Sequence, residues 1–303
     1  LYRNTLIPML FIMFALGSIV IVSGLLFNQN DFITAVFEID KREITSIQYK
    51  QFDWRVFLTA STLLFSSFIG FDAIAQTGNE AKNPTKNIPR AILLAIFIVS
   101  IYYILFTISV YNIVPWNFVA DESLIKDITA PGLLSYVLPP FWGILIILGA
   151  TIALINDLPA MILSVSRLMF AWSKDKIFPD KVSSIHEKYS TPYISILIVG
   201  IVASIGSIGS HFAGDFFLGI DIMVTSMMIN FLLMCITVIT IAKVNPKLYK
   251  EITIFKNRTL QKIIGYLGSL VIIIFLVIHT YKDLTSEVDA WYFHSTFIYL
   301  IVM

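Results

Sequence analysis

The stretch FSSFIGFDAIAQTGNEAKNPTKNIPR, residues 65–90, joins an apolar run to a short charged loop. Gly70 stands inside the run, close to Asp72, which is the only charged residue between Val56 and Gly78. Glycine and serine weaken regular helix and leave little bulk over the backbone. The pattern therefore predicts a helix that is broken at Gly70. At membrane depth a break is tolerated only where it is buried in protein or lines a wet cavity, so its backbone groups become partners for a ligand. The alternative is a Gly that allows close packing and an Asp that is hydrogen-bonded within a helical bundle.

The whole composition indicates lipid as the solvent. The chain is 57% hydrophobic and only 14% charged, with a mean hydropathy of +0.82, whereas globular domains carry roughly a quarter charged residues. A helix needs roughly 20 apolar residues to cross a bilayer. Eight candidate runs are present, of which the last is too short to cross: 6–27, 56–78, 91–115, 133–172, 189–210, 216–242, 263–281 and 290–303. Because the chain begins at Leu1 and not at Met, we expect it to be part of a longer protein.

Several function classes are disfavoured by the sequence. The net charge is +1, which gives no basic field for binding nucleic acid. A single Cys235 excludes an intrachain disulfide and a cysteine-based metal cluster, and the four His residues show no metal-ligand spacing. We find no phosphate-binding loop and no acid–base constellation. We therefore expect no enzyme activity, no metal and no cofactor beyond a coupling ion.

Positive residues are distributed unevenly over the loops. Cytoplasmic loops near membrane spans are enriched in Lys and Arg. Loops 79–90, 173–191 and 243–262, counted together with Arg3 and Arg167, hold 15 of the 21 Lys and Arg residues. We predict that these three loops are cytoplasmic and that the protein is a multi-pass protein of the plasma membrane. The loop 28–55 contains a partly alternating apolar pattern that could form a short surface helix.

Residues 65–90 resemble the sixth helix and following loop of the amino acid–polyamine–organocation superfamily, which read FIGFDAxAxxxxExKNPxxxIP. A second stretch, SRLMFAWSKDKIFP (residues 166–179), followed by Thr191-Pro192, is similar to the end of that family's eighth helix, although Lys176 replaces the usual Gly. The resemblance implies an all-α integral membrane protein, a leucine-transporter-type inverted-repeat helical bundle that lacks its first four helices. Residues 5–27 would be the last helix of the first repeat, 56–243 the second repeat and 262–303 the peripheral helices of a single transporter domain.

The same resemblance implies a secondary active transporter, a symporter or an exchanger, for amino acids or related amines. The alternatives are a membrane amino-acid sensor or receptor and a truncated permease segment that transports nothing. The backbone carbonyls of Phe68, Ile69 and Gly70 would accept the substrate amine, with Phe65 and Phe71 as aromatic walls and Ser66 beside them. Asp72 would sense protons or order the following half-helix. Coupling to H+, coupling to Na+ and substrate exchange all stay open, and the oligomeric state is undetermined.

Four further polar residues are candidates on the other spans. Asp157 lies midway along the run 133–172, where burying a carboxylate is costly and by default marks a site; the alternative is an Asp that caps a segment kinked by Pro159. Ser226 either faces the site or serves helix packing. Glu80 and Arg167 lie near the predicted cytoplasmic edge, where they either form an inner gate or anchor the interface.

Overall fold

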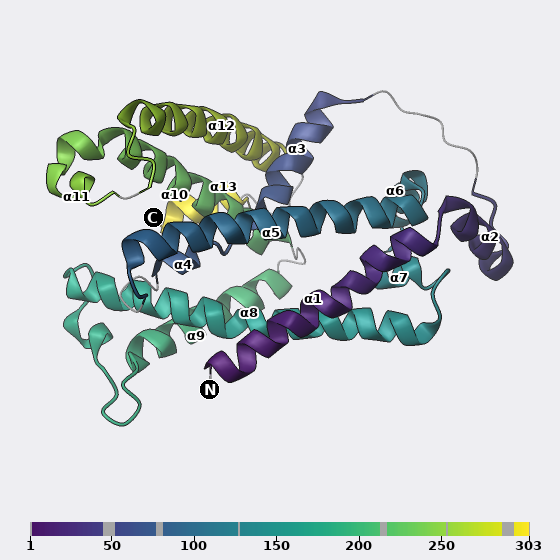
Figure 1. The fold of residues 1–303 in the computed structure, drawn as a ribbon, viewed down its shortest axis with the longest axis horizontal. Coiled ribbons are helices and arrows are strands. Elements are labelled where there is room, and N and C mark those ends of the chain that lie inside the picture. Colours follow the sequence, from purple (N-terminus) through teal and green to yellow (C-terminus); the bar gives the residue numbers. More distant parts are fainter. Residues whose placement is uncertain are drawn as a thin grey trace. The chain divides into compact units, whose positions relative to one another are not determined.

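The computed structural model describes residues 2–44, 52–76, 81–126, 128–212, 217–252, 254–286 and 294–302. All regular structure in these ranges is helical (Figure 1), which confirms the predicted all-α class. Two of the helices are 3-10, η1 Phe65–Phe68 and η3 Asp180–Ser183. The α-helices are α1 Tyr2–Leu26, α2 Gln29–Asp40, α3 Trp54–Leu64, α4 Ala73–Gln76, α5 Pro84–Ile113, α6 Trp116–Ser123, α7 Ala130–Leu134, α8 Pro140–Lys174, α9 Tyr193–Phe212, α10 Phe217–Val244, α11 Pro246–Lys250, α12 Arg258–Thr285 and α13 Ser295–Val302.

Six helical segments among the described residues are long and apolar enough to cross a membrane: α1, the broken α3–α4 segment, α5, α8, α10 and α12. A seventh, Tyr193–Gly209 within α9, is apolar but shorter. These seven segments fall on the first seven predicted runs. The eighth run contains α13, of which 8 residues are described.

The predicted run 133–172 is not one helix. α7 ends at Leu134 and α8 begins only at Pro140. Proline is favoured in the first turn of a helix, and the Pro139-Pro140 pair starts a new helix. Pro159 lies inside α8 without ending it, and the helix continues to Lys174.

The structure divides into two compact units, and each is described by itself. The first comprises the described parts of residues 1–51 and 97–161. In this unit α2 forms the predicted surface helix, and its Phe32 and Val36 are fully buried. The ring of Phe32 meets the edge of Phe118 with centroids 5.0 Å apart. Burial of an aromatic side chain such as Phe32 stabilises by roughly 1.5–3 kcal/mol. The core of the unit consists of Val20, Phe32, Val36, Ile113, Val114, Phe118, Leu133, Leu134, Leu138 and Ile146.

The helices α1 and α5 approach each other closely through a glycine. A Cβ atom placed on Gly24 would lie 2.4 Å from the Cβ of Ser109 and 2.5 Å from its Cα. The amide of Asn112 donates to the carbonyl of Gly24 at 2.8 Å. Small residues that let backbones approach, together with such interhelical hydrogen bonds, are typical of helix packing in lipid.

A charged cluster lies beside α2 in the same unit. The Glu122 side chain is 2% exposed and accepts from Lys126 at 2.8 Å and from Arg42 at 2.5 Å. These hydrogen bonds, that from Lys126 first, hold the pKa of Glu122 below its usual range. The hydroxyl of Tyr136 donates to Asp40 at 2.7 Å; burial first, and then this carboxylate, raise the pKa of Tyr136 to about 12. The cluster ties α6 and the loop after α7 to the C-terminal end of α2.

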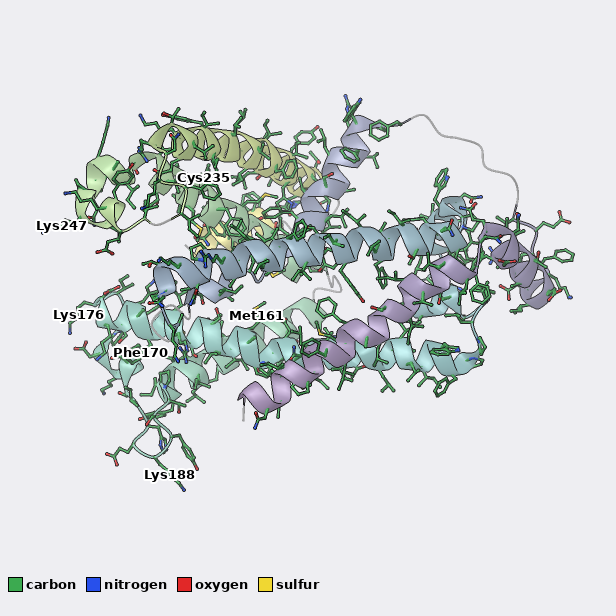
Figure 2. The ribbon with its side chains drawn as sticks, in the orientation of Figure 1. Met161, Phe170, Lys176, Lys188, Cys235 and Lys247 are labelled. Atoms are coloured by element: carbon green, nitrogen blue, oxygen red, sulfur yellow. The ribbon has the colours of Figure 1, made fainter. Side chains whose placement is uncertain are left out.

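The second unit comprises the described parts of residues 52–96 and 162–303. Its central pair is α10 and α12, which lie side by side (Figure 1). A Cβ atom on Gly268 would lie 2.9 Å from the sulfur of Cys235 on α10, a residue labelled in Figure 2. Buried His279 of α12 contacts the hydroxyl of Thr225 on α10 at 3.0 Å. The Asp283 carboxylate accepts two backbone N–H groups at the start of α13, both at 2.9 Å. Polar contacts therefore join α10, α12 and α13.

Candidate functional site

The predicted break in the second span is present in the structure. α3 ends at Leu64, the 3-10 turn of η1 follows, and Ile69 is extended with φ −68° and ψ 141°. Gly70 then has φ 120° and is the only glycine with positive φ in the described part of the chain. That conformation strains any residue with a side chain, and glycine adopts it freely. Helix resumes with α4 at Ala73.

The Asp72 side chain folds back across the break. Its Oδ1 accepts the backbone N–H of Gly70 at 3.3 Å. Asp72 itself is half-buried. The carboxylate therefore helps to hold the turn, which is a structural role beside the proposed role in coupling.

Some backbone groups of the break already take part in hydrogen bonds. The carbonyl of Ser66 accepts from Ile69 N at 3.1 Å, and that of Gly70 accepts from Ala73 N at 3.1 Å. A backbone carbonyl has two lone pairs, so the Gly70 carbonyl retains one acceptor position.

A single ring on α10 contacts both sides of the break. Phe231 stacks on Phe71, with centroids 5.3 Å apart and an interplanar angle of 17°. Phe65 meets the same ring edge-on, with centroids 5.9 Å apart. The two aromatic residues predicted as walls are thus brought together by Phe231. Sequence reasoning missed Phe231, because it is one of 24 Phe residues in the chain and no spacing sets it apart.

The second half of α8 contacts the segment that follows the break. Buried Ser164 forms a hydrogen bond with the side-chain oxygen of Gln76, the last residue of α4. Arg167 follows Ser164 by three residues and so lies on the same face of α8. Gln76 was also missed, although a polar residue one turn after Asp72 in an apolar segment was a usable signal.

The other predicted residues are placed as follows. Ser226 donates its hydroxyl to the carbonyl of Ile222 one turn earlier in α10, at 2.9 Å. Asp157 is exposed, near the middle of α8, and belongs to the first unit, whereas the broken helix belongs to the second. Glu80 lies outside the described residues. The hydroxyl of Ser226 is therefore hydrogen-bonded within α10 in this structure.

A metal site is not indicated within the described ranges, since no group of three or more His, Cys, Asp or Glu side chains gathers there. The chemistry that the break offers is hydrogen bonding by backbone groups beside an aromatic surface. Such a surface can hold a small polar ligand without a covalent step.

Comparison with known proteins places this geometry in a family. The model of the family described as "Amino acid permease" matches residues 5–303. The branched-chain amino acid permease BcaP of Bacillus subtilis is 26% identical over 171 residues, which cover 54% of this chain and 36% of the relative. The low-affinity putrescine importer PlaP of Escherichia coli K12 is 28% identical over 214 residues, 69% of this chain and 43% of that protein. The mouse cationic amino acid transporter 4 is 26% identical over 157 residues, 52% of this chain and 24% of that protein.

The chain therefore spans less than half the length of these relatives. The family match runs from near the first residue to the last, and the six long apolar helices accord with a protein that is integral to a membrane. The resemblance drawn from residues 65–90 and 166–179 is confirmed by this match. The chain belongs to the amino acid permease family.

Proposed function

We propose that the protein of which these helices form the transport core is a secondary transporter for amino acids or related amines, working by alternating access. The observation that supports this most directly is the break at Gly70, where irregular backbone occurs within an apolar span. In a membrane such backbone needs polar partners, and in transporters it commonly provides the substrate site. The substrate would bind at this break.

The substrate class rests on what these three relatives have in common. Their names specify branched-chain amino acids, cationic amino acids and putrescine. All of these compounds carry an ammonium group, which donates hydrogen bonds and accepts none. The carbonyls of Phe68, Ile69 and Gly70 are acceptors of the matching kind. The ring of Phe71, stacked on Phe231, would supply an apolar wall for the rest of the ligand.

We assign different roles to the two predicted carboxylates, Asp72 and Asp157. Asp72 is bonded to the backbone of the break, and we propose that it couples transport to H+ through this turn. Asp157 is exposed in the middle of α8, and we propose that it favours substrates with a second positive charge. Arg167, with Glu80, would close the cytoplasmic side. Na+ coupling and exchange remain alternatives that the uptake experiment separates.

The test is uptake of labelled Leu, Ala, Lys, Arg and putrescine into proteoliposomes, with and without a pH gradient, with and without Na+, and with and without unlabelled substrate inside the vesicles. Asp72→Asn should abolish dependence on the gradient, and Asp157→Asn should reduce uptake of Lys, Arg and putrescine, which carry a second positive group, while sparing Leu. Asp175→Asn is the matched control, because Asp175 is exposed beyond the end of α8. Gradient dependence that survives in Asp72→Asn would remove Asp72 from coupling, and a requirement for Na+ would replace H+ as the ion.

A sensor or receptor is the competing function. It would bind the same compounds at the break without moving them. Saturable binding by the purified protein, with neither accumulation nor exchange in the vesicles, would refute transport and favour the receptor.

A further inference from the structure

A groove lies in the second unit, and its lining residues do not include those of the break. It has a volume of about 490 Å³ and lies between the first turns of α5 and the segment around α11. That size falls within the roughly 300–1,000 Å³ of sites that hold small ligands. Seven of its nine lining residues are apolar. Pro89, Ile92 and Leu93 lie on one face of α5, and Leu248, Ile252 and Phe255 form the opposite wall.

The groove lies at the end of a membrane span. α5 begins at Pro84 and is apolar enough to cross a bilayer, so its first turns mark the membrane edge. Leu93 is 51% exposed and Phe255 is 52% exposed. Apolar side chains that are this open at a membrane edge face the region where lipid chains meet their headgroups.

Basic residues surround the groove. Lys86 and Arg90 each follow a lining residue of α5 by one position and so occupy the neighbouring stripe of the helix. Lys247 and Lys250 flank Leu248 on α11, where Figure 2 shows Lys247 on the outer side, and Lys256 follows Phe255. All five are exposed.

The balance of charge is strongly positive, because Glu251 is the only carboxylate among the described residues that line the groove. Arg258, although close in sequence, is engaged with the carbonyls of Val238 and Ile239 and is not counted. An apolar groove with a cationic rim complements one kind of molecule, an amphiphile with a negative headgroup.

We propose that this groove binds an anionic phospholipid of the bilayer, with an acyl chain along the groove and the phosphate among the basic side chains. The loop distribution of Lys and Arg predicts that this end faces the cytoplasm, and the cytoplasmic leaflet carries the anionic lipids. Basic pockets on that side are suited to lipid headgroups. The inference does not depend on the transport proposal.

The first experiment uses the full chain, purified in a neutral detergent. Phosphatidylglycerol with a photoreactive group on its acyl chain is added, and the labelled peptides are mapped by mass spectrometry. We expect labelling within residues 85–93 and 246–255, and preferential retention of phosphatidylglycerol over phosphatidylcholine by roughly tenfold, because nearby basic side chains each attract anionic lipid. Equal retention of both lipids, or labelling elsewhere, overturns the proposal.

Two charge variants separate a site from a diffuse surface charge. Arg90→Gln combined with Lys247→Gln and Lys250→Gln should reduce retention of phosphatidylglycerol to the level of phosphatidylcholine. The matched control neutralises three exposed lysines of another loop, Lys174, Lys181 and Lys188, and should leave the preference unchanged. An equal loss in both variants overturns the groove as the site.

A third variant tests the position of the acyl chain. Leu93→Trp adds bulk to the groove at a half-exposed position, so the fold should persist, as checked by circular dichroism. Labelling of residues 246–255 should fall. Unchanged labelling overturns the placement of the chain, and retention of neither lipid by the unaltered protein overturns the proposal. Neither readout involves transport, so failure here leaves the transport proposal untouched.

Discussion

Gly24→Ala should separate α1 from α5. The added Cβ would lie 2.4 Å from the Cβ of Ser109, whereas ordinary contact begins at 3.4 Å, so about 1 Å of movement is required. The nearest atoms include the Ser109 Cα, which is backbone and cannot rotate away. The helices must therefore shift, and the 2.8 Å hydrogen bond from Asn112 to the Gly24 carbonyl lengthens.

The expected cost follows from these contacts. Overpacking costs about 1–3 kcal/mol, and weakening one hydrogen bond adds about 0.5–1.5 kcal/mol. The better helix propensity of Ala returns about 0.8–1 kcal/mol. We expect a net loss of about 1–3 kcal/mol, seen as a lower midpoint of unfolding by sodium dodecyl sulfate in mixed micelles, followed by circular dichroism.

Gly200→Ala in α9 is the matched control. Apart from its own stretch of helix, no atom of the described residues lies within 4 Å of the position of its added Cβ, so the variant should be unchanged or slightly more stable because of helix propensity. If Gly24→Ala unfolds at the same concentration as Gly200→Ala, the close approach of α1 and α5 does not exist as described.

Three further predictions concern other contacts. Lys126 and Arg42 lower the pKa of Glu122, so their stabilisation is complete above the unfolded-state pKa of that carboxyl and is lost as the pH falls through the lower folded-state value. Glu122→Gln should remove this acid dependence, and unfolding midpoints taken between about pH 7 and about pH 3 check it. Asp283→Asn should weaken the cap of α13, which hydrogen exchange of that helix would register as faster exchange; unchanged rates would contradict it. Phe231→Ala removes the ring that contacts both sides of the break and should lower the unfolding midpoint and raise the apparent KM for uptake, whereas a normal KM would show that the ring is only packing.

Much of the fold could be predicted from the sequence because lipid imposes a simple rule. Charges are excluded from the spans, so the uncharged runs mark the helices, and the seven longest runs agree with helical segments. Hydropathy gives no information about backbone geometry, so the rule does not predict a turn inside an apolar run. Residues 133–139 are as apolar as α8, yet Pro139 and Pro140 place a turn there.

The site was predictable in its backbone and not in its surroundings. Gly70, two residues before the intramembrane Asp72, predicts a break, because glycine reaches φ 120° at little cost. Phe231 and Ser164 come from helices far away in the sequence, and their contacts with the break depend on how whole helices pack. That packing of helices cannot be inferred from one sequence without information about tertiary contacts. Asp157 and Arg167 therefore remain predictions as ligand and gate.

The conformation of Gly70 has a consequence for how such a protein diversifies. Any L side chain is strained at this position. Substitution, which is the usual way in which a binding surface changes, is therefore unfavourable there. A ligand that binds this backbone therefore meets the same exposed N–H and C=O groups in every homologue that keeps the turn. New preferences must be introduced in the neighbouring side chains, and Phe231, which contacts both sides of the break, is the position where a single codon change would alter both walls at once.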